Sequence, residues 1–300
     1  MIKQISNYSL NDQSILGGKA YSLLLLDQNK FIIPKTFVVD SDIFSSILEA
    51  ISFAKRCEEI LSLNVDLYDH VTLTEISRNI CNIIDEIKLE IDIDILDDDL
   101  LYAVRSSASC EDSTKFSCAG RFKSFLGIHK SDVAKYIVEV WKSKYSVSAL
   151  SYLYKNKIEI TSLSMAVVVQ EQINSEISGV AFSKNPVDNN SEQVVVEAVY
   201  GLGESLVSGE VTPDTYIYNI STKELDFENI SDQKTQLIIE NGILEQRAGN
   251  MIRKLSVEKL EEIVTKLLEL KSIYKTDVDI EWAYVDQKLY MLQCRPITTI

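Results

Sequence analysis

A short stretch near the end of the chain carries three polar side chains that could bind a metal ion together with a phosphate. The stretch is DIEWAYVDQKLYMLQCRPITT, residues 279–299, and the side chains belong to Glu281, Gln293 and Arg295. Carboxylate and amide oxygens suit Mg²⁺, which completes its coordination shell with phosphate and water. An arginine beside them could neutralise the same phosphates. The alternative is an ordinary solvated face of a β-sheet.

The three side chains must share a face, and the pattern of the stretch predicts a β-hairpin that achieves this. Side chains alternate between the faces of a strand, and directly opposed residues share one. A two-residue turn at 286–287 would oppose Glu281 to Leu292, whereas a three-residue loop at 286–288 opposes Glu281 to Gln293. Because a one-residue slip exchanges the faces, the hydrophobic pattern favours the three-residue loop. The other predicted pairs are Asp279 with Arg295, Ile280 with Cys294, Trp282 with Leu292, and Tyr284 with Tyr290.

Two earlier segments could contact the phosphates of a nucleotide. GGK, residues 17–19, precedes a predicted helix, and the N–H groups at a helix N-terminus attract anions, with Lys19 beside them. The P-loop pattern G-x-x-x-x-G-K-[ST] is absent, and a structural turn is the alternative. In VRSSASCED, residues 104–112, Arg105 could clamp a phosphate through two hydrogen bonds or could pair with Glu111 or Asp112.

A glycine-rich segment, YGLGE at residues 200–204, resembles part of a dinucleotide-binding pattern. Position 206 is leucine, so G-x-G-x-x-G is not completed and a Rossmann interpretation is excluded. A loop that closes over a ligand and a plain glycine-rich turn both stay open.

Composition limits the classes of partner. The chain has 300 residues, 46% of them hydrophobic, and a formal net charge of −15. This charge argues against sequence-independent binding of nucleic acid and against an anionic membrane surface. No apolar run reaches the ~18 residues of a membrane span, and the N-terminus lacks an apolar signal core. Five cysteines without a C-x-x-C pair predict free thiols in a reducing cytoplasm, and two distant histidines make a zinc site improbable.

The elements that must position these residues are of mixed type. We expect a helix from about Lys19, a strand after Pro34, helical segments over 42–91 and 132–154, and an amphipathic helix over 256–274. Further strands are expected at 101–104, after Gly120, in SMAVVVQEQI (164–173), in SGVAFSKNPV, in EQVVVEAVY and in the final hairpin. Strands and helices mix without strict alternation, which predicts an α+β chain of two lobes.

Eight segments in this order resemble the ATP-binding domain of the phosphoenolpyruvate synthase and pyruvate phosphate dikinase family, which includes rifampin phosphotransferases. Together they run from about residue 14 to 299. They are GGKAYSLLLL, IPKTFVV, AVRSSASCED, AGRFKSFLGI, MAVVVQEQI, SGVAFSKNP, YGLGESLVSGEVTPD and DIEWAYVDQKLYMLQCRPIT.

The resemblance implies an ATP-grasp-like fold with the nucleotide between an N-terminal lobe, residues 1–185, and a C-terminal lobe, residues 186–300. It implies that Lys19 and Arg105 contact the nucleotide phosphates. The other implied contacts are Gly120 and Ser124 on the phosphate side, Gln170 near the adenine and the hinge, Glu281 and Gln293 as Mg²⁺ ligands supported by Asp279, and Arg295 at the phosphate being transferred. Arg121 and Ser124 depart from the family pattern, where Gln and Thr are usual, and Cys294 stands where Ala or Ser is common.

The function implied is that of a dikinase-type phosphotransferase. ATP phosphates would pass to a histidine on a separate swivelling domain, releasing AMP, and then to a small acceptor such as pyruvate, a rifamycin-type antibiotic or a glutamine-like amide. No T-x-x-G-G-x-x-S-H pattern occurs, so we expect the histidine domain and the acceptor domain to be supplied elsewhere. The alternatives are an ATP-grasp ligase that forms an acyl phosphate and ADP, and a non-catalytic nucleotide sensor. Neither nucleic acid nor a membrane is an expected partner.

Overall fold

The computed structural model describes residues 2–61, 69–109, 120–158, 163–249 and 251–297. The chain divides into two compact units. Unit 1 comprises residues 1–25 and 35–172, and unit 2 comprises residues 26–34 and 173–300. Each unit is built on its own antiparallel sheet, so the expected α+β class is confirmed.

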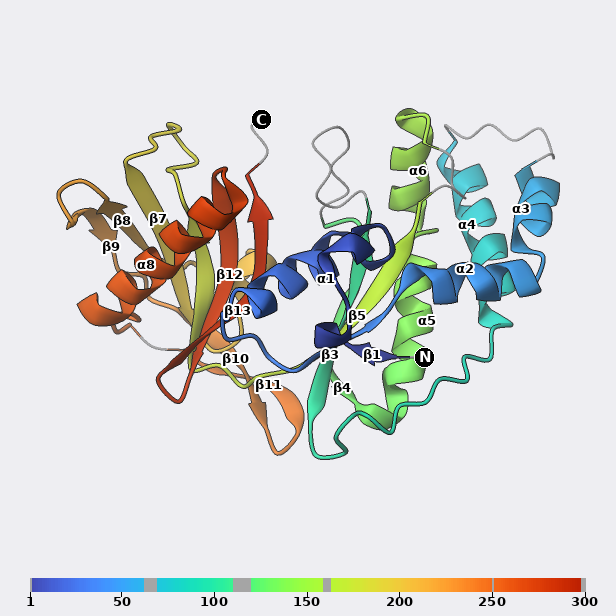
Figure 1. Ribbon diagram of the computed structural model, residues 1–300, viewed down its shortest axis with the longest axis horizontal. Helices are drawn as coiled ribbons and strands as arrows, with labels where there is room; N and C mark the ends of the chain where they lie inside the picture. The colour runs from blue at the N-terminus through green and yellow to red at the C-terminus, as the bar shows by residue number, and fades with distance from the viewer. Residues whose placement is uncertain (1, 62–68, 110–119, 159–162, 250, 298–300) are drawn as a thin grey trace. The chain divides into compact units, whose positions relative to one another are not determined.

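Unit 1 has a five-stranded sheet in the order β1-β2-β5-β3-β4 (Figure 1). Its strands are β1 (Lys3–Gln4), β2 (Thr36–Val39), β3 (Leu101–Ala108), β4 (Ser124–His129) and β5 (Met165–Glu171). Its helices are α1 (Gln13–Gln28, whose last three residues fall in unit 2), α2 (Ser41–Ala50), α3 (Phe53–Leu61), α4 (His70–Asp85), α5 (Val133–Ser143) and α6 (Val147–Lys155). Single 3₁₀ turns cover Ile5–Asn7, Leu10–Asp12 and Lys130–Asp132. The helical period over 42–91 is thus divided among three helices, the last of which ends at Asp85.

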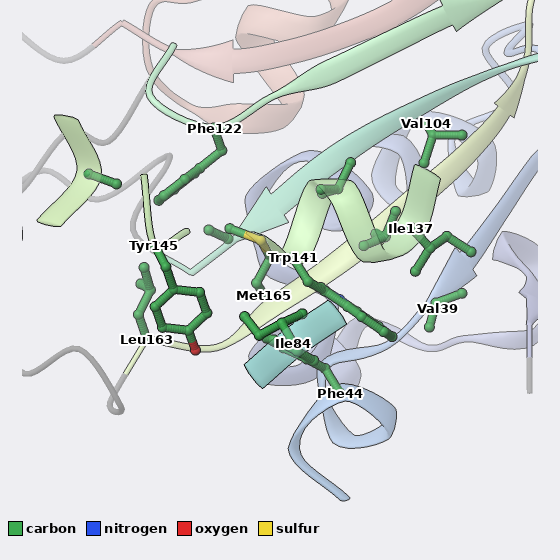
Figure 2. Packing of buried hydrophobic residues seen from close by; sticks show 14 of the residues in the cluster. Val39, Phe44, Ile84, Val104, Phe122, Ile137, Trp141, Tyr145, Leu163 and Met165 are labelled. Carbon is green, nitrogen blue, oxygen red and sulfur yellow. The ribbon is translucent and has the colours of Figure 1, made fainter. Parts of the chain in front are cut away.

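One face of the unit 1 sheet packs against a helical core. Val104, Val167 and Val169 are fully buried there, together with Ile137 and Trp141 of α5. Figure 2 shows Val104, Ile137 and Trp141 in this cluster. Burying branched apolar side chains on one face leaves the alternate residues of the same strands to the other face, which carries the candidate polar groups.

Unit 2 has a six-stranded sheet in the order β13-β12-β6-β7-β8-β9 and a separate hairpin, β10-β11. The strands are β6 (Ile177–Phe182), β7 (Gln193–Tyr200), β8 (Asp214–Asn219), β9 (Glu224–Asn229), β10 (Thr235–Glu240), β11 (Ile243–Ala248), β12 (Val278–Val285) and β13 (Lys288–Pro296). The helices are α7 (Glu204–Val207) and α8 (Val257–Tyr274).

Helix α8 covers one face of the six-stranded sheet, as Figure 1 shows. Ser256 caps its N-terminus by accepting the Lys259 backbone N–H, as the sequence predicts. The predicted stripe, which includes Leu260, Ile263, Leu267 and Leu270, is buried. The Tyr284 hydroxyl donates to the Glu262 carboxylate at 2.7 Å and so ties β12 to the helix.

The units divide in the sequence after Gln172, not after residue 185 as the sequence suggested. The reason is β6, which pairs with β7 and with β12 and therefore belongs to the sheet of unit 2. The segment 26–34 also belongs to unit 2, where Ile32 O accepts the Met291 backbone N–H of β13 at 2.8 Å. The boundary between the two units is therefore set by hydrogen-bonded pairing between strands that are far apart in the sequence, which the local sequence pattern does not reveal.

Candidate functional site

The final hairpin opposes Glu281 to Gln293, but through a different turn from the predicted one. The turn has two residues, Asp286 and Gln287, both with positive φ (48° and 63°). The ladder runs from Val285–Lys288 to Trp282–Met291, and a β-bulge then shifts the register. Beyond the bulge, Glu281 lies opposite Gln293 and Asp279 opposite Arg295.

The three-residue loop was therefore wrong, and so were two of the apolar pairs. Trp282 pairs with Met291 in place of Leu292, and Tyr284 pairs with Leu289 in place of Tyr290. The positive φ angles suit a tight primed turn, whose twist matches that of the strands. The extra residue then goes into the bulge, which restores the register that the hydrophobic pattern demands.

The hairpin consequently has one apolar and one polar face. Trp282, Met291 and Cys294 are buried on the α8 side. Glu281 is half-buried on the other side of the sheet, called the site face below, and Gln293 opposite it is 6% exposed. Two oxygen-bearing side chains thus meet on one face, as the sequence predicts.

Arg295 is oriented on the site face by an ion pair. Its Nε donates to both carboxylate oxygens of Asp279, at 2.9 and 2.8 Å. The Arg295 side chain is 44% exposed, and that of Asp279 is 13% exposed. Asp279, proposed from the family likeness as a support for the metal, is hydrogen-bonded to the arginine.

In unit 1, Arg105 lies directly opposite Ser124, so the two side chains share a face of the β3-β4 ladder. Ser107 is two residues along β3 on the same face. Its hydroxyl donates to Leu16 O at 2.6 Å and accepts the Ala20 N–H at 2.9 Å. The glycine turn before Lys19 is therefore fixed to the strand that carries Arg105.

Gly17 is required at this contact. Its φ is +69°, and a Cβ there would lie 2.1 Å from Ser107 O. Helical geometry is interrupted at Gly17 within α1. The GGK segment therefore forms a turn held against β3 at Ser107, and Lys19 directly follows the two glycines of this turn.

Gln170 is near the end of β5, close to the boundary between the units in the sequence. It is 3% exposed, and its Nε2 donates to Thr36 Oγ1 at 3.0 Å. It lies opposite Ala103 and Thr36, on the face that also bears Arg105. Its amide nitrogen is therefore bonded to β2, a contact that the sequence did not predict.

Gly120 and Arg121 follow a part of the chain outside the described residues. Gly120 is exposed with φ +70°, and a Cβ there would meet nothing within 4 Å, so its backbone angle alone favours glycine. The Arg121 guanidinium carbon lies 4.0 Å from the centre of the Tyr152 ring on α6, a cation–π contact. Glu111 and Asp112, the alternative partners of Arg105, lie outside the described residues, as do Cys110 and Cys118.

The YGLGE segment is an anchored turn. Gly201 has φ +79°, and a Cβ there would lie 2.3 Å from Leu237 O. Its carbonyl accepts the Ser175 and Ser178 hydroxyls at 2.9 and 2.6 Å. The Leu202 N–H donates to Leu237 O at 2.8 Å. These contacts favour the glycine-rich turn over a loop that closes on a ligand.

Sequence reasoning missed Glu197 on β7. Glu281 lies opposite Val180, and Val180 lies opposite Glu197, so both glutamates are on the site face. Burial raises the pKa of the Glu197 carboxyl. The signal was present in VVVEAV, where a glutamate interrupts an apolar strand as Glu281 does.

Three further observations concern metal-binding clusters, cysteines and membrane-spanning helices. Among the described residues, no group of three or more His, Cys, Asp or Glu side chains could hold a metal ion. The cysteines at 57, 81 and 294 are free thiols. Within the described parts of the chain, none of the helices combines the length and apolar character needed to cross a bilayer.

Comparison with known proteins gives the family. A family model described as the pyruvate phosphate dikinase AMP/ATP-binding domain matches residues 13–300. The chain belongs to this family. A probable phosphoenolpyruvate synthase of Methanocaldococcus jannaschii is 33% identical over 100% of the chain and 27% of the relative.

Two further relatives of this dikinase-family chain extend the comparison. A probable phosphoenolpyruvate synthase of Archaeoglobus fulgidus is 32% identical over 99% of the chain and 41% of its own length. The rifampicin phosphotransferase of Bacillus cereus is 28% identical over 95% of the chain and 34% of its own length. The chain thus spans less than half the length of each. A solved D-alanine–D-alanine ligase of Helicobacter pylori superposes with a TM-score of 0.33 at 11% identity, too low to support an argument.

The donor set on the site face fits Mg²⁺ in a nucleotide complex. Glu281 offers a carboxylate and Gln293 an amide oxygen, and Mg²⁺ is commonly bound by one or two protein groups plus phosphates and water.

Proposed function

We propose that the chain binds Mg-ATP and forms the nucleotide-binding part of a dikinase-type phosphotransferase. The observation that carries the proposal is the opposition of Glu281 and Gln293 on one face, with Arg295 two residues further along β13. Membership in a family of AMP/ATP-binding domains, together with the pairing of these side chains, supports a nucleotide-binding site over an ordinary solvated sheet face.

In unit 2, Glu281 and Gln293 would hold Mg²⁺ through a carboxylate and an amide oxygen. When bound, the ion would neutralise and orient the phosphate oxygens of the nucleotide. Arg295 would donate hydrogen bonds to the phosphate being transferred, and Asp279 would keep its guanidinium on the site face. Asp279 is thus a positioning residue, because it acts through Arg295.

In unit 1, we propose that Lys19 and Arg105 contact the nucleotide phosphates. The glycine turn fixed to Ser107 gives Lys19 a defined position, and Ser124 lies opposite Arg105 with a hydroxyl that can donate to the same anion. Gly120 is proposed on the phosphate side because its exposed backbone leaves room for a close approach. Gln170 is proposed near the adenine, with its side chain oriented by Thr36.

The reaction proposed is transfer of ATP phosphates to a histidine on a swivelling domain, with release of AMP. That domain and an acceptor domain would lie in the same full-length protein or in a partner, which the greater length of the relatives supports. The acceptor would be a small molecule, such as pyruvate, a rifamycin-type antibiotic or a glutamine-like amide. The chain itself would contribute binding, orientation and charge neutralisation.

The nucleotide product tests this function. The chain is supplied with a histidine-bearing domain of a full-length relative, and the products of ATP are separated by chromatography. We expect AMP, and we expect its formation to disappear in Glu281→Ala and Arg295→Ala, with thermal unfolding curves close to that of the wild type. ADP formation in place of AMP would favour a ligase. Unchanged AMP formation in both variants would refute the assigned roles.

A further inference from the structure

A half-buried carboxylate in unit 2 lies in one row with the proposed metal ligands. Gln293, Glu281, Val180 and Glu197 follow one another across four neighbouring strands, and Thr215 of β8 continues the row. Directly opposed residues share a face, so the row runs across the site face. With strands about 4.8 Å apart, the Cα atoms of Glu281 and Glu197 are separated by roughly 10 Å.

Glu197 has no partner within the described residues. Its side chain makes neither a hydrogen bond nor an ion pair there, and burial is the only cause that raises its pKa. The residues opposite it, Val180 and Thr215, carry no charge. Placing a carboxylate in a partly desolvated position without a partner costs stability. A group retained at such a cost is typical of a ligand-binding site.

The chemistry of a Mg-nucleotide leaves one good match for this carboxylate. The phosphates are anionic and repel it, and the ring nitrogens of adenine are acceptors. The N6 amino group of adenine is a donor, but it lies farther along the nucleotide from the phosphates than the ribose does. The ribose 2′ and 3′ hydroxyls are two adjacent O–H donors, which suit the two acceptor oxygens of an ionised glutamate. The separation between Glu281 and Glu197 suits this arrangement, because the rest of the phosphate chain lies between the ribose and the metal-bound phosphates.

We propose that Glu197 binds the ribose hydroxyls of a nucleotide whose phosphates are held at Glu281 and Gln293, and so selects ribonucleotides over deoxyribonucleotides. This inference rests on the proposed function, because it requires a Mg-nucleotide on the site face. It adds a specificity-determining residue to that site.

The test is a set of calorimetric titrations on the 300-residue chain. The ligands are Mg-ATP, Mg-2′-deoxyATP and Mg-3′-deoxyATP, and the proteins are the wild type, Glu197→Gln, Glu197→Ala and Glu224→Gln. Glu224 is an exposed glutamate of β9 in the same sheet and serves as the matched control. We expect the wild type and the control to prefer ATP over each deoxy analogue by roughly tenfold, the effect of a charge-assisted hydrogen bond.

In Glu197→Ala we expect the ratio of the affinity for ATP to that for each deoxy analogue to fall to about one. Glu197→Gln should give a ratio between those of the wild type and the alanine variant. Each deoxy analogue keeps one of the two hydroxyls, so Glu197→Ala should weaken its binding, but less than it weakens the binding of ATP. The inference is overturned if the wild type binds all three nucleotides alike, or if Glu197→Ala weakens all three equally. If the wild type binds no nucleotide, both this inference and the proposed function are refuted, whereas binding without discrimination refutes the inference alone.

Discussion

Glu281 lies directly opposite Gln293 because a bulge on β13 compensates for the two-residue turn at Asp286 and Gln287. Without the bulge, this turn would oppose Glu281 to Leu292 and move the amide away from the carboxylate. The bulge therefore positions the proposed metal ligands, in agreement with the frequent occurrence of bulges near functional sites.

A substitution in the turn at Asp286 and Gln287 should increase the stability of the hairpin. Gln287 has φ +63°, a region that costs a residue with a Cβ about 1–2 kcal/mol. We expect Gln287→Gly to raise the free energy of unfolding of unit 2 by about 0.5 kcal/mol after the entropic cost of glycine. Urea unfolding followed by Trp282 fluorescence, in a Trp141→Phe background, measures this. Lys288→Gly, within β13, is the control and should destabilise; equal effects of both glycines would contradict the turn geometry.

The contact between Gly17 and Ser107 predicts an unusually large loss for a small substitution. Gly17→Ala places a Cβ 2.1 Å from a backbone oxygen and should cost ~3 kcal/mol or more. Gly120→Ala is the matched control, since its φ is similar but nothing lies within 4 Å, and it should cost only about 1 kcal/mol. Thermal unfolding compares the two. Similar losses would show that Gly17 does not lie against Ser107.

The pair Asp279–Arg295 predicts non-additive effects on binding. Arg295→Ala should weaken Mg-ATP binding by roughly ten- to a hundredfold, the range for hydrogen bonds to charged groups. Asp279→Asn should cost less, because the arginine loses its orientation but is still present. In the Arg295→Ala background, Asp279→Asn should add little. Fully additive losses in a titration series would show that Asp279 acts independently of the arginine, for example on the metal.

The raised pKa of Glu197 predicts the pH dependence of a stabilising substitution. A carboxyl whose pKa is higher in the folded than in the unfolded chain destabilises the fold wherever it is ionised. Glu197→Gln should therefore raise the melting temperature at neutral pH. The gain should shrink as the pH falls through the folded-state pKa and vanish below the unfolded value near 4.5. A gain independent of pH would point to packing as its cause.

The sequence predicted those parts of the site that depend on local pattern. Alternating apolar residues placed Glu281 and Gln293 on one face, and the glycines before Lys19 marked a turn. The turn length could not be predicted, because a two-residue turn with a bulge and a three-residue loop without one both oppose Glu281 to Gln293 and Ile280 to Cys294. Only the backbone angles of Asp286 and Gln287 separate these two solutions.

Features that depend on strand order lay beyond the sequence. Glu197 joins the row of Glu281 only because β6 lies between β7 and β12, although β12 is nearly 80 residues further along the chain. The assignment of β6 to unit 2 has the same origin, as does the approach of Gly17 to Ser107. A single sequence contains no direct signal for such long-range pairings.

The dependence of ATP binding on Mg²⁺ tests the central proposal most directly. Calorimetry measures the dissociation constant of ATP with Mg²⁺ and with EDTA, for the wild type, Glu281→Gln and the control Glu224→Gln. We expect Mg²⁺ to tighten binding by at least about tenfold in the wild type and the control, and to have little effect in Glu281→Gln. The same Mg²⁺ dependence in all three proteins, or no ATP binding by the wild type, would contradict a nucleotide–metal site at Glu281 and Gln293.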